Sequence, residues 1–189
     1  MMSVLTMRLL KILGTTLTIA TGIVGIVGQS AHAVELRDGT LWFDRAPRLV
    51  AATTTFDNVD AWGATYYFTI NLPPKAGEPL KRVVINQIEG LDDIEYQLKD
   101  TSAFEGMPRS KGKKVTLGEV TINQEKRTIS VTFDPPVQPG TTVTVGLVPV
   151  RNPLTDGVYL FGVTTFPAGE ERRNGLYLGV GRLQFYRRF

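Results

Sequence analysis

The chain has 189 residues, 42% of them hydrophobic and 21% charged, with a formal net charge of +3, no cysteine and a single histidine, His32. The lack of cysteine excludes disulfides, thiolate nucleophiles and a lipid anchor attached through a thiol. The small net charge argues against a nucleic-acid partner, which needs a concentrated basic face.

Residues 1–33 have the three parts of a secretory signal. Arg8 and Lys11 supply the positive start, and 12–27 is an uncharged, mostly apolar stretch. An alanine–histidine–alanine sequence ending at Ala33 then gives the small residues that signal peptidase requires. We therefore expect export, with cleavage after Ala33.

An uncleaved membrane anchor is the alternative interpretation of this segment. A spanning helix needs about 20 apolar residues, and 9–28 reaches that length only by including Lys11. Cleavage would leave one mature domain, 34–189, without a membrane span. That domain has no histidine and a net charge of +1, so it has no imidazole base and no Cys/His zinc site.

Short stretches of alternating hydrophobic and polar residues predict β-strands, and 19 glycines and 11 prolines punctuate them as turns. The weaker pattern of 34–60 predicts an N-terminal edge strand or a segment wrapping the domain. A stretch that is apolar on both faces, 158–165, predicts a central strand covered on both sides. The other strands are expected at 66–72, 80–88, 94–98, 115–122, 127–133, 141–148 and 176–186.

The alternation slips by one residue at two places. One is Gly118 with Glu119, and the other lies around Gly179 and Gly181. A slip would turn every later side chain to the wrong face unless a bulge absorbs it. Bulges are the favoured interpretation, and two shorter strands joined by a bend are the alternative.

These patterns predict an all-β fold, an antiparallel β-sandwich of immunoglobulin-like topology with about seven to nine strands. Two charged loops are expected between strands, at 110–114 and 168–175. The predicted buried core consists of the same-face residues Phe68, Ile70, Ile129, Val131, Phe133, Val143, Val145 and Leu160.

Several sequence blocks resemble a known family. They are residues 66–73, 76–80, 139–147, 149–153, 157–163, 166–169 and 177–182. With these blocks, 52–186 resembles the cyanobacterial secreted proteins that are grouped as a domain of unknown function. The resemblance implies export in a cyanobacterium, to the periplasm, the cell envelope or the exterior, with the thylakoid lumen also open. The family has no established active site, so the resemblance implies no site residues.

Two acidic clusters are the candidate metal ligands. They consist of Asp57 and Asp60, and of Asp92, Asp93 and Glu95. Carboxylates at alternating loop positions can supply part of a calcium site, although neither cluster has a complete calcium-loop spacing. Acidic residues also form turns for local backbone reasons. Solvated turns are the favoured interpretation, and paired carboxylates of a hydrolase are a weaker alternative.

Aromatic and basic residues are the candidate ligand contacts. Trp42 and Trp62 are candidates for stacking on sugar rings, although the position of Trp62 before a strand favours a place in the core. A basic patch is the candidate binding surface for an acidic polysaccharide or a lipid headgroup, although solvated loops are the favoured interpretation of the same residues. Its members would be Arg172, Arg173, Arg182, Arg187, Arg188, Lys111, Lys113 and Lys114.

The function that these observations favour is that of an exported, non-enzymatic envelope protein with a binding or scaffold role. Its expected partner is an envelope component, either a polysaccharide or a protein. The alternative is a carbohydrate-binding or calcium-assisted binding module, and a hydrolase is less favoured. No cofactor is expected, because zinc and copper need His, Cys or Met ligands and Met107 is the only such residue after Ala33.

Overall fold

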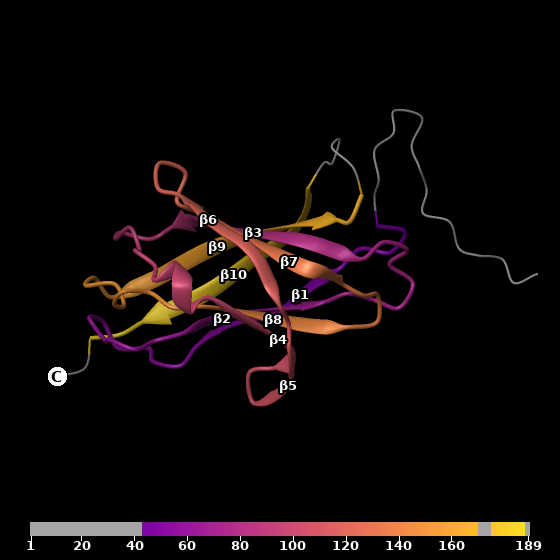
Figure 1. Cartoon of the computed structure of the whole chain (residues 1–189). Coiled ribbons are helices and arrows are strands. Elements are labelled where there is room, and N and C mark those ends of the chain that lie inside the picture. Colours follow the sequence, from indigo (N-terminus) through magenta and orange to yellow (C-terminus); the bar gives the residue numbers. More distant parts are fainter. Residues whose placement is uncertain (1–42, 170–174, 188–189) are drawn as a thin grey trace, which may run out of the picture. The chain divides into compact units, whose positions relative to one another are not determined.

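Figure 1 shows the computed structural model of the chain, which describes residues 43–169 and 175–187. This part folds into two five-stranded antiparallel sheets, so the predicted all-β sandwich is confirmed. Its one helical element is a three-residue 3-10 turn, η1 (Leu98–Asp100). Within the described residues, no helix has the length and apolar character needed to cross a membrane.

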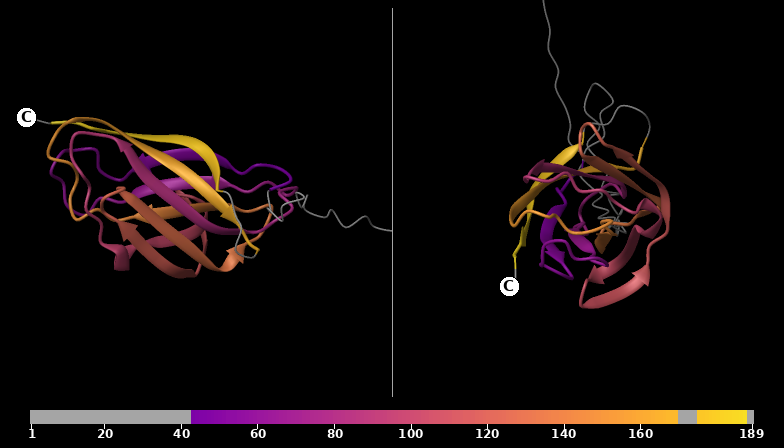
Figure 2. Two further views of the ribbon diagram at one scale, coloured as in Figure 1. Left: turned by 90° about the horizontal axis from the view of Figure 1, so that it is seen from above. Right: turned by 90° about the vertical axis from the view of Figure 1, so that its left-hand side faces the viewer.

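The first sheet has the strand order β1-β2-β8-β4-β5, and the second has the order β10-β9-β3-β7-β6. The left-hand view of Figure 2 looks onto the second sheet. The strands of the first sheet are β1 (Arg48–Thr54), β2 (Tyr66–Asn71), β8 (Thr142–Leu147), β4 (Ser102–Met107) and β5 (Ser110–Lys114). Those of the second are β10 (Leu176–Phe185), β9 (Gly157–Pro167), β3 (Leu80–Glu89), β7 (Thr128–Val137) and β6 (Leu117–Asn123).

The core lies between the sheets and follows the alternation of the strands. Seven of the eight predicted core residues are buried, from Phe68 in β2 to Val145 in β8. Leu160 was wrongly predicted, because Tyr159, Phe161 and Val163 point inward from β9 and Leu160 is only half-buried. Both faces of β9 are apolar, so the alternation did not identify the inner face. The larger aromatic side chains occupy it, where they bury more apolar area.

Aromatic rings pack against one another across the interface between the two sheets. The ring of Tyr66 in the first sheet lies 5.6 Å from that of Phe185 in the second, centroid to centroid. Phe68 and Phe161 make a similar contact at 5.5 Å, and Phe185 also meets Tyr159 edge to face at 5.4 Å. Edge-to-face and tilted packing of this kind adds to the stabilisation from buried area alone.

Both predicted slips of register occur as irregularities in the sheet. In β6 the register with β7 shifts between Leu117 and Val120, across the Gly118-Glu119 pair. In β10 the register with β9 shifts between Tyr177 and Gly179. Gly179 has a φ of +115°, a conformation that a side chain would disfavour. The bulge interpretation is therefore confirmed for both strands.

The structure differs from the sequence prediction in four details. It describes ten strands instead of seven to nine, because β4 and β5 were not predicted and the basic segment 110–114 is a strand. The expected strand at 94–98 is an isolated bridge between Tyr96 and Pro149. No described residues form a second layer over the outer face of the expected central strand β9, where Val158 is 37% exposed. In 34–60, where an edge strand or a wrapping segment was expected, β1 forms an edge of the first sheet.

Candidate functional site

Three loops meet at one end of the sandwich and bring the predicted acidic residues near one another. Backbone hydrogen bonds join them: the Asp60 N–H donates to the Pro153 carbonyl at 2.9 Å, and the Val150 N–H to the Glu95 carbonyl at 2.9 Å. A pocket of 420 Å³ opens between the loops that contain Asp92 and Asn152. Asp92, Asp93 and Glu95 all line it.

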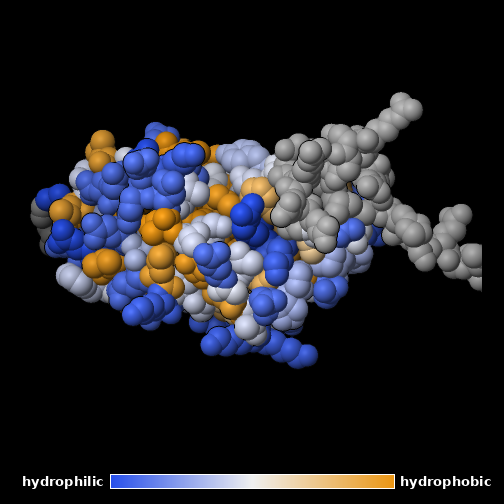
Figure 3. Space-filling model, turned by 45° about the horizontal axis from the view of Figure 1, so that its top comes forward, coloured by the Kyte–Doolittle hydropathy of each residue, from blue (hydrophilic) through white to orange (hydrophobic). Residues whose placement is uncertain are grey.

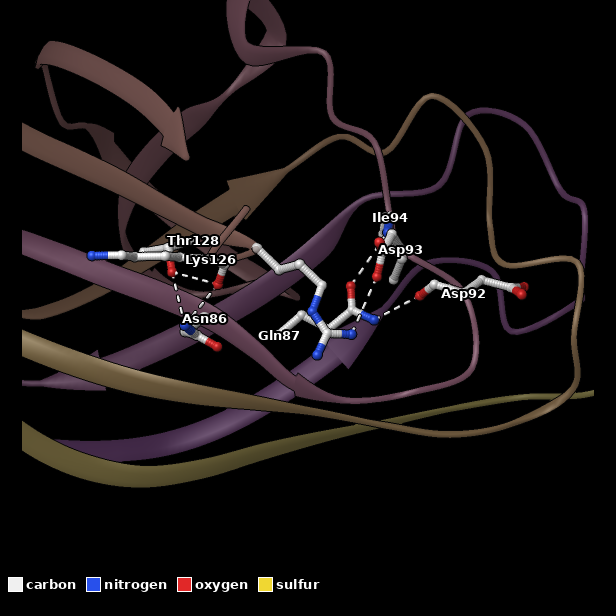
Figure 4. Close-up of polar contacts among 8 residues, drawn as sticks. Asn86, Gln87, Asp92, Asp93, Ile94, Lys126 and Thr128 are labelled. Carbon is white, nitrogen blue, oxygen red and sulfur yellow. Dashed lines mark hydrogen bonds and ion pairs between the residues drawn. The ribbon is translucent and has the colours of Figure 1, made fainter. Parts of the chain in front are cut away.

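The carboxylate of Asp92 is held by the opposite loop. It accepts hydrogen bonds from the Thr155 backbone N–H at 2.8 Å and from the Thr155 hydroxyl at 3.1 Å. The bond from the backbone N–H is the main reason why the pKa of Asp92 is lowered below its usual range. The buried amide of Gln87 fixes the same loop, since it donates to the Asp92 carbonyl at 2.7 Å and accepts from Ile94 (Figure 4).

Two of the other acidic residues form ion pairs with arginines. Arg127 lies 3.2 Å from Asp93, and Arg151 lies 3.3 Å from Asp60. Among residues 43–169 and 175–187, no three acidic, histidine or cysteine side chains come together as a metal-binding group. The two acidic clusters thus lie at the same end of the fold without forming one group of metal ligands. Calcium binding by either cluster stays a prediction.

The Asp92 arrangement predicts an acid-sensitive contribution to stability. Its folded-state pKa lies below the ordinary value of 3.8, so stability is gained above 3.8 and lost as the pH falls through the folded pKa. We expect Asp92→Asn to be less stable than wild type at neutral pH, and the difference to shrink below pH 3.8. Urea unfolding at several pH values measures this. A difference that stays constant with pH would contradict it.

The remaining predicted site residues are dispersed. Trp42, Arg172, Arg173, Arg188 and the cleavage site at Ala33 lie outside the described residues. Trp62 is 68% exposed at a loop tip, so its predicted place in the core is wrong. Trp62 lies in a bend before β2, next to Gly63, whose φ is positive, and its side chain points outward. It lines neither the acidic pocket nor the trough described next.

The basic residues are also divided. Arg187 pairs with Asp156 at 3.8 Å, and Arg182 is exposed on β10 of the second sheet. Lys114 lines a separate hollow with Pro135 and Val137, and Lys111 lies in a hollow on the outer face of the first sheet. The described basic residues therefore do not form the single patch that the sequence suggested.

That hollow belongs to a trough on the outer face of the first sheet, between β1 and the tip of the β4–β5 hairpin. Figure 1 shows this hairpin reaching beyond the neighbouring strands. The trough consists of two hollows of 670 and 480 Å³ that share Met107. Its wall and floor are Arg48, Val50, Ala51, Thr53, Thr54, Thr55, Tyr67, Asn71, Gly106, Met107, Pro108, Arg109, Ser110, Lys111 and Thr142.

Polar and aromatic contacts fix the walls of the trough. The Lys111 ammonium lies 5.4 Å from the ring centre of Tyr67 and 5.1 Å from that of Phe104. It also donates to the Tyr67 hydroxyl at 3.3 Å. The two rings pack edge to face at 5.9 Å. On the floor, the Asn71 amide donates to the Thr142 hydroxyl at 3.0 Å. The hairpin is therefore anchored to the sheet by its own basic side chain.

Sequence reasoning missed most of this trough. Lys111 was a candidate only as part of a basic loop, and Arg48 and Arg109 were not candidates for ligand contact. The available signal was the outward parity of Tyr67 in β2, where its alternating neighbours Phe68 and Ile70 face the core. The fold of the β4–β5 hairpin over that face has no counterpart in the sequence pattern.

The outer face of the second sheet carries a different surface. Exposed apolar side chains come to it from β3, β9 and β10, namely Ile88, Val158, Tyr177 and Val180. Figure 3 shows apolar atoms gathered between polar ones on this side of the molecule. The Tyr177 ring lies close over Gly162, where a Cβ would come within 3.2 Å of it. None of these four side chains lines the acidic pocket or the trough.

The fold and the trough define a β-sandwich domain with a hollow on the outer face of one sheet. Residues 40–185 match the family described as "Protein of unknown function (DUF2808)", and the chain belongs to this family. No curated protein matches the chain.

Solved structures with some likeness come from bacterial surface proteins. The C-terminal domain of the Streptococcus pyogenes antigen I/II-family protein AspA is 15% identical with a TM-score of 0.43, over 71% of this chain and 46% of that one. A collagen-binding domain from a Staphylococcus aureus adhesin is 11% identical with a TM-score of 0.40, over 72% and 97%. The Actinomyces fimbrial adhesin FimA is 13% identical with a TM-score of 0.34, over 67% and 49%. The chain thus spans less than half of the first of these proteins.

Proposed function

We propose that this protein is an exported, non-enzymatic binding domain of the cell envelope that holds an extended polymer in the trough beside β1. The observation that supports this most is the trough itself. From Arg48 to Thr54 its β1 wall extends over about 20 Å at 3.3 Å per residue, and its two hollows share Met107. An elongated hollow of this kind suits a chain molecule better than a small compact ligand.

The chemistry of the side chains supports binding more than catalysis. No histidine or cysteine follows Ala33 in the sequence. The acidic residues best placed for general acid or base chemistry are held in other contacts. Asp92 accepts a hydrogen bond from Thr155, and Asp93 forms an ion pair with Arg127. A raised carboxyl pKa, which marks many general acids, does not occur at Asp92, whose pKa is lowered.

Export is part of the proposal and rests on the signal pattern of residues 1–33. Cleavage after Ala33 would release the domain into the periplasm, the envelope, the exterior or, in a cyanobacterium, the thylakoid lumen. N-terminal sequencing of the exported protein is expected to begin at Val34. Recovery of the full-length chain from the membrane would contradict cleavage.

A pair of tyrosine variants tests the trough as the binding surface. Tyr67 faces the trough, and Tyr177 is an exposed aromatic residue on the outer face of the opposite sheet. We expect Tyr67→Ala to weaken binding of the purified protein to insoluble envelope polysaccharide by about tenfold. Tyr177→Ala should bind like wild type. Circular dichroism and thermal unfolding establish that both variants are folded.

If Tyr177→Ala weakened binding and Tyr67→Ala did not, binding would be assigned to the second sheet. If neither variant changed retention on the envelope fraction while both stayed folded, the trough would not be the binding surface. If the wild-type protein were not retained at all, the binding function itself would be wrong.

A further inference from the structure

Among the described residues, the cations of the trough have no acidic partner in an ion pair. The described ion pairs engage Lys81, Arg127, Arg151 and Arg187, and none involves a basic residue of the trough. No aspartate or glutamate is among the residues that line it. Its cations are Arg48, Arg109 and Lys111, all of which are exposed. An uncompensated cluster of positive charge attracts anionic ligands and speeds their association.

Among these three cations, Lys111 is the one whose charge is positioned by described contacts. Its ammonium is placed by two aromatic rings and the Tyr67 hydroxyl, with no carboxylate among its described contacts. Attraction between an ammonium and a ring face restricts a side chain that is otherwise flexible. Less rotamer freedom then remains to be lost when an anion binds, which favours affinity. Lys111 is therefore a positioned cation on the wall of the trough.

The backbone around the trough favours a sugar over a peptide. The trough lies on the face of the sheet, where β1 and β2 are already paired from Arg48–Asn71 to Thr54–Tyr66. A peptide lying on this face, and not along the outer edge of β1, finds no strand edge for main-chain pairing. What the face offers is side-chain hydroxyls and an amide, from Thr53, Thr55, Asn71, Ser110 and Thr142. These groups match the many hydroxyls of a polysaccharide.

We infer that the polymer in the trough is an acidic polysaccharide, whose carboxylate or sulfate groups bind Lys111 and Arg109 at one part of the trough and Arg48 at the other. This inference rests on the proposed function, since it names the ligand class of the same trough. The hydroxyl-bearing residues between the cations hold the sugar hydroxyls, and Tyr67, Ala51 and Met107 supply the apolar contact area.

Calorimetric titration with defined polymers tests this ligand class. Alginate serves as the acidic polysaccharide, dextran sulfate as a sulfated one, dextran as the neutral control and poly-glutamate as the acidic peptide. We expect the wild-type protein to bind alginate or dextran sulfate at least about tenfold more tightly than dextran or poly-glutamate. Binding should weaken as salt is raised, because exposed charge contacts are screened.

Two double variants that lose the same charge test whether binding depends on the trough cations or on the net charge of the protein. Lys111→Gln/Arg109→Gln removes the trough cations and is expected to weaken acidic-polysaccharide binding about tenfold. Lys126→Gln/Arg182→Gln removes two exposed cations from outside the trough and should leave binding unchanged. Equal losses in both double variants would overturn the inference, because binding would then follow overall charge.

Failure of the inference can be told from failure of the proposed function. Dextran binding equal to that of alginate, lost in Tyr67→Ala, would keep the trough as a polymer site and reject the anionic class. Tighter binding of poly-glutamate would replace the polysaccharide by an acidic protein. If no acidic polysaccharide bound even at low salt, the inference would be wrong, while Tyr67-dependent retention on the envelope fraction would still support the proposed function.

Discussion

Replacing Phe133 by alanine is expected to lower the free energy of unfolding by about 3–5 kcal/mol. Phe133 lies on the inner face of β7 with 0% of its surface exposed. Truncation removes the transfer free energy of the ring and leaves a cavity between the two sheets, because the hydrogen-bonded ladder within each sheet limits how far its strands can move to fill the space. Urea or guanidinium unfolding, followed by far-ultraviolet circular dichroism, measures the change.

Phe56→Ala is the matched control for this prediction. It makes the same truncation at a loop side chain that is 52% exposed, where the loss should stay below about 1 kcal/mol. If Phe133→Ala also changed the unfolding free energy by less than about 1 kcal/mol, the face assigned to β7 would be wrong.

The strands that could be predicted are those with one apolar face. In β7 and β8 the large apolar residues share one parity, and in β2 only Tyr67 departs from it, so burial of apolar area decides which face is inner. The two glycine-marked slips in β6 and β10 were predictable because a slip in the alternation leaves a visible change of parity. Local sequence contains the whole signal in these cases.

The strands that could not be predicted depend on contacts distant in sequence. The five residues of β5 are all exposed and include three lysines, so no alternation marks them. They form a strand because β4 is paired with β8 and offers its free edge to β5. The inner face of β9 was misassigned for a related reason, since Leu160 and Phe161 are both apolar and only packing between them and the other sheet selects one.

The candidate site was less predictable than the fold. The acidic residues were found from the sequence, yet their partners Thr155, Arg127 and Arg151 come from other loops and decide that the carboxylates stay apart. The trough arises where the β4–β5 hairpin lies beside β1, segments about fifty residues apart in the chain. Sequence composition identified Lys111 as basic, but its placement over Tyr67 is a tertiary contact.

Asn152→Ala is expected to destabilise the protein by about 3 kcal/mol, although Asn152 carries no charge. Its side chain is 1% exposed and makes three hydrogen bonds. The amide donates to the carbonyls of Phe56 at 3.0 Å and Asn58 at 2.8 Å, and its oxygen accepts from the Tyr66 hydroxyl at 2.9 Å. Alanine removes a buried side chain that joins the loop after β1 to the start of β2. Chemical denaturation measures the loss.

A double-mutant cycle with Tyr66→Phe separates the buried hydrogen bond from the loss of loop contacts. Tyr66 has 0% of its surface exposed, and burial raises the pKa of its hydroxyl, which therefore stays neutral and able to donate. In Asn152→Ala this hydroxyl loses its acceptor and remains buried, which costs more than the bond itself contributes. Tyr66→Phe removes the stranded donor, so Asn152→Ala should cost about 1–2 kcal/mol less in that background. Additive effects of the two substitutions would mean that the Tyr66 hydroxyl finds another acceptor, and that Asn152 acts on stability only through the carbonyls of Phe56 and Asn58.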